Sequence, residues 1–122
     1  MNNSSNKFVL DKSSLEFFLA AQSNKYNKIA YFSSTEYDFD DIKNKLLKIN
    51  PKLNVIEFPS FDCLFFSNLS PTNKNKSDRI NCLHNLVFSD VSDNIIISSL
   101  KAIATNTINI ETVKKFQLVI RN

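Results

Sequence analysis

Lys12 and Ser13 form the dipeptide in this chain that comes nearest to a phosphate-binding loop. In the pattern GxxxxGK followed by Ser or Thr, two glycines let the backbone bend around the phosphates, the lysine contacts the β- and γ-phosphates, and the hydroxyl binds Mg²⁺. Here Asn6 and Asp11 occupy the two glycine positions, and the chain contains no glycine. Asp11 also puts negative charge where phosphates would lie. We therefore interpret Asp11, Lys12 and Ser13 as a degenerate phosphate loop, and we expect neither a bound cofactor nor ATP hydrolysis in this chain.

Other residues capable of acid–base or metal chemistry lack partners at useful spacings. His84 is the single histidine, which favours a structural role over that of a ligand or general base. Several carboxylates precede or begin a predicted helix, where they favour the helix dipole and are expected to cap rather than catalyse. These carboxylates are Glu36, Asp38, Asp40 and Asp41. Cys63 and Cys82 show no CxxC spacing and no companion histidine cluster, which indicates buried free thiols and no metal site.

The composition indicates one domain with a modest core. The chain has 122 residues, of which 43% are hydrophobic and 22% charged. The net charge of +3 makes the chain only weakly basic. Its lysines are scattered, and the densest group, Lys74 and Lys76, is weak evidence for nucleic-acid binding. No apolar run reaches the ~20 residues of a membrane span. The first residues lack the apolar core of a secretory signal, so we expect a cytoplasmic location and no membrane partner.

Hydrophobic periodicity predicts the elements that would position these residues. Helical spacing and capping residues predict helices over 14–23 (with Ser13 and Glu16 as a capping box), over 39–49 and from Ser77 onward. β-branched and aromatic runs predict strands over 28–33, 53–58 and 94–98. Residues 7–10 are predicted to form an edge strand or the entry to the first helix. Residues 99–104 are predicted to form one or two helical turns. Residues 113–120 are predicted to form a last strand or a helix-to-strand transition.

The order of these elements predicts the fold class. Strands separated by helices of this length imply right-handed βαβ units. We therefore expect an α/β domain of three layers, with a mostly parallel sheet and helices on both faces. Residues 1–6 read as a disordered tail, and 7–122 as a single domain.

The segment 58–71, FPSFDCLFFSNLSP, is too aromatic for a solvated loop and too irregular for a strand. Four phenylalanines exposed together would create an apolar patch of several hundred Å². The rings must therefore pack onto the domain or onto a partner. A buried connection that completes the core is one reading, and a protein- or nucleic-acid-binding surface is the other.

This segment and the predicted helix after it resemble a known family. The pattern FPxFDxLxFxxxSP, followed by an arginine in a helix, is similar to the N-terminal, UvrB-like part of the bacterial transcription-repair coupling factor family (Mfd). The resemblance spans roughly residues 8–105, and the family usually has Pro and Tyr where Phe65 and Phe66 stand here. The motif residues are Phe58, Pro59, Phe61, Asp62, Leu64, Phe66, Ser70, Pro71 and Arg79.

The resemblance implies a non-catalytic domain of degenerate P-loop NTPase or helicase type. Aligned through it, the phosphate-loop lysine position falls near Leu15. The parent family couples transcription to nucleotide excision repair: it displaces stalled RNA polymerase from damaged, double-stranded DNA and recruits the Uvr proteins, UvrA among them. Its ATP- and Mg-dependent motor, its polymerase-binding module and its UvrA-contacting insertion lie outside the residues matched here. The expected partners of this chain are then the other domains of a longer coupling factor.

A carboxylate in an aromatic loop needs a donor, and an arginine in a nearby helix can supply a forked one. We therefore predict that Arg79 pairs with Asp62 or with neighbouring backbone carbonyls. Two other readings remain open for the whole chain. One is an unrelated small α/β protein that binds a partner or oligomerises, and the other is a nucleotide-binding enzyme with an atypical phosphate site.

Overall fold

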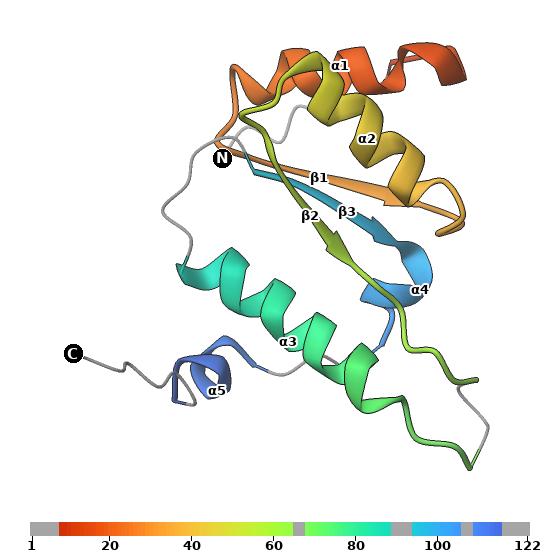
Figure 1. Cartoon of the computed structure of the whole chain (residues 1–122), viewed down its shortest axis with the longest axis vertical. Helices are drawn as coiled ribbons and strands as arrows, with labels where there is room; N and C mark the ends of the chain where they lie inside the picture. The colour runs from red at the N-terminus through yellow and green to blue at the C-terminus, as the bar shows by residue number, and fades with distance from the viewer. Residues whose placement is uncertain (1–7, 65–67, 89–93, 106–108, 116–122) are drawn as a thin grey trace.

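The computed structural model describes residues 8–64, 68–88, 94–105 and 109–115, without the side chains of 110 and 113 (Figure 1). Among these residues, no helix combines the length and the apolar character that crossing a bilayer requires. The elements in chain order are η1 (Lys12–Ser14), α1 (Leu15–Ser23), β1 (Lys28–Ser33), α2 (Phe39–Ile49), β2 (Asn54–Phe58), α3 (Asn73–Phe88), β3 (Asn94–Ser99), α4 (Leu100–Ile103) and α5 (Ile110–Lys115).

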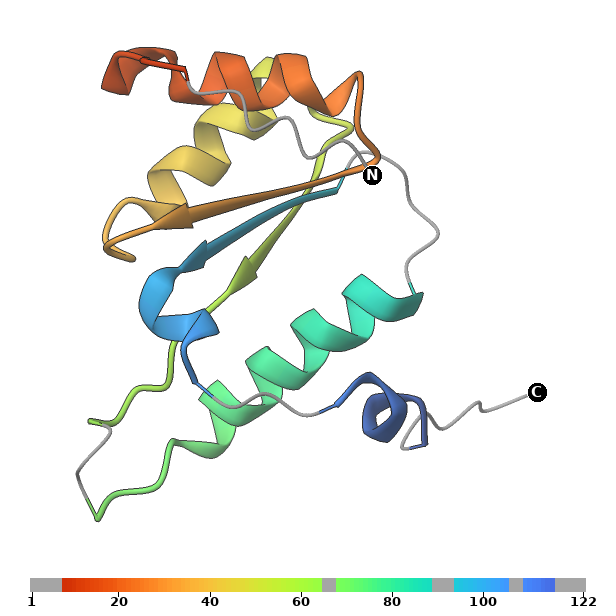
Figure 2. The same ribbon diagram turned by 180° about the vertical axis from the view of Figure 1, so that it is seen from behind.

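The three strands form a parallel sheet in the order β1-β3-β2. Ile95 in the central strand pairs with Ile29 on one side and Val55 on the other. The chain crosses from β1 to β2 through α2 and returns to the middle through α3. Because these crossovers run in opposite directions along the sheet, a right-handed connection places their helices on opposite faces. Figures 1 and 2 show α1 and α2 on one face and α3 on the other, so the predicted α/β class is confirmed.

Each face of the sheet is covered by its own hydrophobic cluster. Leu46, Ile95 and Ile97 are fully excluded from solvent in the larger cluster, between the sheet and helices α1 and α2. The buried side chains there are Leu19, Ala20, Phe39, Ile42, Leu46, Leu53, Ile95 and Ile97. The smaller cluster lies under α3 and α4 and comprises Ile56, Phe58, Cys82 and Ala102, with Leu83 and Leu86 packed against it. The near-continuous apolar run of β3 is explained by burial on both faces.

Helix α3 begins four residues earlier than the sequence indicated, at Asn73 instead of Ser77. Thr72 precedes the helix and caps it: its carbonyl accepts from the Lys76 N–H (3.0 Å) and its hydroxyl from the Asn75 N–H (3.2 Å). The first turn carries only Asn and Lys, so it has no apolar periodicity to predict it. The predicted connection at 72–76 is therefore the capped first turn of α3.

Three further expectations change near the chain ends. Residues 8–10 belong to neither a strand nor a helix, although the Phe8 ring lies 5.5 Å from that of Phe18. No side-chain capping bond forms at the start of α1, and Glu16 instead pairs with Lys45 of α2 at 3.3 Å. Residues 113–115 are helical, so a strand does not begin at 113, whereas a helix-to-strand transition agrees with this part of the segment. The predicted tail at 1–6 and the remainder of the predicted last element, 116–120, lie outside the described residues.

Truncation of Leu46 should strongly destabilise the protein. Leu46 is fully buried between α2 and the sheet, so Leu46→Ala leaves a cavity and should lower the free energy of unfolding by about 2–5 kcal/mol. Urea denaturation followed by circular dichroism measures this. The matched control is Ile49→Ala in the same helix, whose side chain is 38% exposed and should lose much less. Equal losses in the two variants would contradict the described packing of α2.

Candidate functional site

The carboxyl ends of the three strands, with the loops that leave them, meet in one region that we call the carboxyl edge. The chain leaves β1 toward α2 on one face, whereas it leaves β3 directly into α4 on the other. Such a divergence of connections is where open α/β sheets place their ligand sites. Glu36 lies at the centre of this region: it accepts from the Ser99 hydroxyl (2.5 Å) and from the Ser60 N–H (2.9 Å). One carboxylate thus joins the ends of all three strands.

Glu36 is held in its charged form. Partial burial pushes its pKa upward, but hydrogen bonds from Ser99 and Ser60 stabilise the carboxylate and the net shift is downward. The sequence predicted Glu36 to favour the dipole of the following helix, together with Asp40 and Asp41. Asp40 and Asp41 do lie in the first turn of α2. Glu36 instead accepts hydrogen bonds from residues at the ends of the other two strands. Its position just after a parallel strand was the signal that could have identified it.

The serine hydroxyls at this edge are already engaged. Ser99 accepts from the Ala102 N–H (3.1 Å), which caps α4, while donating to Glu36. Ser98 donates to the Phe58 carbonyl at 3.0 Å. Neither serine is paired with a histidine, because His84 lies on α3 with its ring 4.7 Å from that of Phe88. The geometry therefore indicates structural hydroxyls rather than a nucleophile with its base.

Arg79 of α3 is buried, at 4% exposure, in a set of contacts that we call the arginine clamp. Its guanidinium carbon lies 4.2 Å from the centroids of both the Phe58 and Phe61 rings. The clamp also contains hydrogen bonds from Arg79 to the Pro59 carbonyl (2.5 Å), the Thr105 hydroxyl (3.0 Å) and the Ala102 carbonyl (3.4 Å). Burial lowers the pKa of this guanidinium. The clamp ties α3 to the loop after β2 and to the end of α4.

Asp62 is not the partner of Arg79. It accepts from the Thr72 hydroxyl (2.5 Å) and the Thr72 N–H (3.0 Å), and these bonds lower its pKa. Of the two partners that the sequence allowed for Arg79, the structure has the backbone carbonyl, at Pro59. The Asp62 oxygens are engaged by Thr72, whereas the planar guanidinium of Arg79 stacks on the rings of Phe58 and Phe61 and reaches the carbonyl between them in sequence.

The other residues of the predicted motif are more peripheral. Leu64 is 74% exposed, Ser70 is exposed and Pro71 is partly buried. Phe65 and Phe66 lie outside the described residues. Phe58 and Phe61 pack within the domain, as a buried connection requires.

The segment interpreted from sequence as a degenerate phosphate loop lies on the surface, next to the start of α2. Asp11, Lys12 and Ser13 are all exposed, and the Lys12 ammonium pairs with Asp38 at 3.5 Å. The Asp11 carbonyl accepts from the Ser14 N–H as the chain enters the short helix η1.

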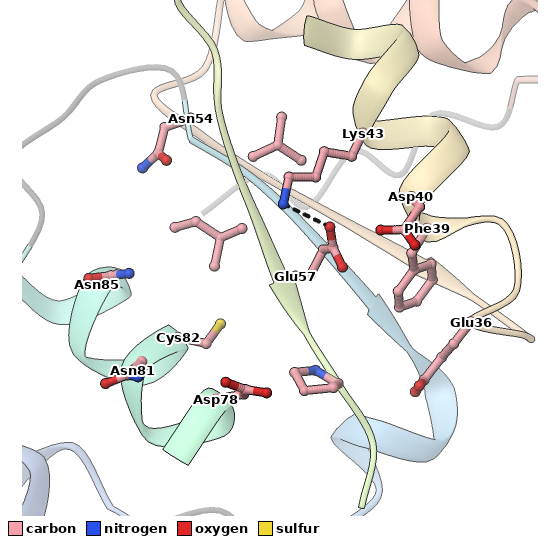
Figure 3. A pocket seen from close by; sticks show the side chains of 13 residues that line it. Glu36, Phe39, Asp40, Lys43, Asn54, Glu57, Asp78, Asn81, Cys82 and Asn85 are labelled. Atoms are coloured by element: carbon pink, nitrogen blue, oxygen red, sulfur yellow. Dashed lines mark ion pairs between the residues drawn. The ribbon is translucent and has the colours of Figure 1, made fainter. Parts of the chain in front are cut away.

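A groove of about 500 Å³ runs beside β2, between α2 and α3 (Figure 3). We call it the β2 groove. Its lining residues are Glu36, Phe39, Asp40, Lys43, Asn54, Val55, Ile56, Glu57, Pro59, Asp78, Asn81, Cys82 and Asn85. Lys43 and Glu57 point toward each other across it, 2.9 Å apart. Burial raises the pKa of the Cys82 thiol to about 11, so this thiol stays protonated at neutral pH.

Cys63 and Cys82 are free thiols, as the sequence indicated, with Cys82 buried and Cys63 partly so. Across the described ranges, no group of three His, Cys, Asp or Glu side chains is arranged to hold a metal ion. The polar groups of the carboxyl edge thus mainly connect secondary-structure elements, and the β2 groove is the open polar surface beside them.

Replacement of Arg79 by lysine should destabilise the protein although the charge is kept. Lysine lacks the planar fork that reaches several oxygens and stacks on two rings, so Arg79→Lys should cost about 2–4 kcal/mol in the free energy of unfolding. The opposite exchange at an exposed position of the same helix, Lys74→Arg, should change it by less than about 0.5 kcal/mol. Urea denaturation compares the two, and a wild-type stability for Arg79→Lys would rule out the clamp as a stabilising unit.

Glu36 should contribute stability that acid removes. Its folded-state pKa lies below the ordinary value of 4.5, so its contribution is complete above that value and is lost as the pH falls through the folded-state pKa. Glu36→Gln should therefore lose stability near neutral pH and depend less steeply on pH in acid. Urea midpoints measured from about pH 7 to about pH 3 test this, with Asp40→Asn as an exposed control. Parallel pH curves for wild type and Glu36→Gln would show that the three hydrogen-bonded strand ends do not depend on this charge.

Comparisons of the chain with models of known protein families, with curated proteins and with solved structures found no match. The likeness of the segment around residues 58–79 to the coupling-factor family therefore stays a prediction from sequence.

Proposed function

We propose that this chain is a non-catalytic scaffold module of the transcription-repair coupling factor type. The observation that carries the proposal is the arginine clamp. Phe58, Pro59, Phe61 and Arg79 belong to the motif on which the resemblance rests, and the buried Arg79 contacts the other three. A motif that serves to fix the path of a loop is suited to a domain whose task is to present surfaces, not to turn over a substrate.

The exposed phosphate-loop residues support the non-catalytic part of this proposal. Lys12 pairs with Asp38, and Asp11 brings a negative charge to the same turn. Phosphate sites need converging N–H groups and positive potential, and here two carboxylates, those of Asp11 and Asp38, lie beside the single lysine. We accordingly propose that the parallel sheet is a degenerate version of the P-loop NTPase or helicase-like core, which has the layered fold but no functional phosphate-binding loop.

In this proposal the chain works within a longer protein. ATP and Mg²⁺ would be bound by a separate motor module, and contacts to RNA polymerase, UvrA and double-stranded DNA would be made mainly by other domains. The module described here would hold those domains in place and offer its own surfaces to them. The overall task is to displace stalled polymerase from damaged DNA and to recruit the repair proteins.

The proposal predicts that nucleotide chemistry does not depend on the degenerate loop. Isothermal titration of this chain with MgATP should give no heat of binding. In the product of the complete reading frame, stalled RNA polymerase should be displaced in an ATP-dependent manner. Lys12→Ala should leave the rate of ATP hydrolysis by that product unchanged, because in this proposal the motor module binds the nucleotide and Lys12 pairs with Asp38 on the surface.

Two results would contradict the proposal. One is a complete reading frame whose product neither hydrolyses ATP nor displaces polymerase. The other is loss of ATP hydrolysis in Lys12→Ala, with Lys25→Ala as the exposed-lysine control that retains it.

A further inference from the structure

The β2 groove follows the open edge of the sheet. Asn54, Val55, Ile56 and Glu57 are consecutive residues of β2, and all four line it. Successive side chains of a strand point to opposite faces, so a cavity that touches four in a row lies along the strand's edge and not over one face. Within the described residues β2 pairs only with β3, and its other edge adjoins the groove. Unpaired N–H and C=O groups of such an edge can pair with another strand.

Two helices wall this edge. From α2 come Phe39, Asp40 and Lys43, and from α3 come Asp78, Asn81, Cys82 and Asn85 at the spacing of one helical face. Figure 3 shows Cys82 and Asp78 of α3 pointing toward β2. A strand flanked by two helices offers a floor of backbone hydrogen bonds and two walls of side chains, which is the arrangement used for recognition of an extended peptide.

The walls carry negative charge on a chain that is positive overall. Among the lining residues four carboxylates face one ammonium, that of Lys43, whereas the whole chain has a net charge of +3. Glu36 stays charged because its pKa is lowered. The Lys43 ammonium pairs with Glu57 at 2.9 Å, which leaves the other three carboxylates of the lining in excess. The groove thus favours a cationic occupant.

Charge also separates the possible occupants. Nucleic acid would bring phosphates against the carboxylates, and a second copy of the chain would bring an identical acidic groove. A small apolar ligand would meet mostly carboxylates and amides, whereas ligand pockets are mostly apolar. An extended peptide with lysine or arginine side chains can pair its backbone with the open edge of β2 and its positive charges with the carboxylates of the walls.

We propose that the β2 groove binds an extended, basic peptide segment of a partner protein by adding it as a further strand beside β2. The basic side chains lie against Asp40, Glu57 and Asp78, and the peptide backbone pairs with the open edge. This inference rests on the groove alone and goes beyond the coupling-factor proposal, so either can fail without the other.

The test uses synthetic peptides of alternating lysine and valine, about eight residues long, labelled for fluorescence anisotropy. We expect saturable binding that weakens with salt, and no binding of the glutamate–valine counterpart. The double variant Asp40→Lys, Asp78→Lys replaces exposed wall carboxylates and should weaken binding by at least about tenfold. The control double variant Asp11→Lys, Glu111→Lys makes the same charge change on other exposed surfaces and should bind like the wild type.

Backbone pairing is tested separately with N-methylated peptides. Only alternate N–H groups of an added strand point toward its neighbour, so methylation of one alternate set should abolish binding and methylation of the other should not. Equal effects of the two sets would overturn strand addition. An equal loss in the control variant would show non-specific charge attraction, and self-association through this edge in sedimentation would identify a second copy as the occupant. Either result would overturn the proposal.

Discussion

Arg79 is a buried cation whose described partners are neutral: two carbonyl oxygens, one hydroxyl and two aromatic faces. Removing a guanidinium from water is costly unless its donors are met, so the surrounding chain has to supply that solvation. It does so from two places far apart in sequence: the end of β2 with the loop after it, and the end of α4 with the residues that follow. The aromatic loop has a defined path because the cation inside it requires one.

The sheet and its covering helices could be predicted from sequence because each depends on local patterning. The apolar run of β3 and the helical spacing of Phe39, Ile42 and Leu46 are reproduced almost to the residue. The start of α3 could not be predicted from apolar periodicity, because its first turn is held by hydrogen bonds to Thr72 and from Asn75 to the Ser60 carbonyl. The spacing of apolar residues along the chain does not predict a helical turn made only of polar residues.

The candidate site was less predictable for the same reason. Arg79 and its loop stood out by residue type, but the choice between Asp62 and a carbonyl depends on a three-dimensional path. Glu36 and the β2 groove depend on which strands become neighbours, and strand order is not written in any one segment. What turns these scattered polar residues into a surface is the placement of β2 at the edge, where α2 and α3 come to lie on either side of it.

The central position of β3 has a consequence for how the chain assembles. Lys28–Ser33 and Asn54–Phe58 never pair with each other, and both pair with a strand that is synthesised after them. On the ribosome the sheet therefore has no backbone pairing until residue 94 and its successors have emerged. Until then the apolar faces of the first two helices have no complete surface to cover, because the strand that contributes Ile95 and Ile97 is still missing.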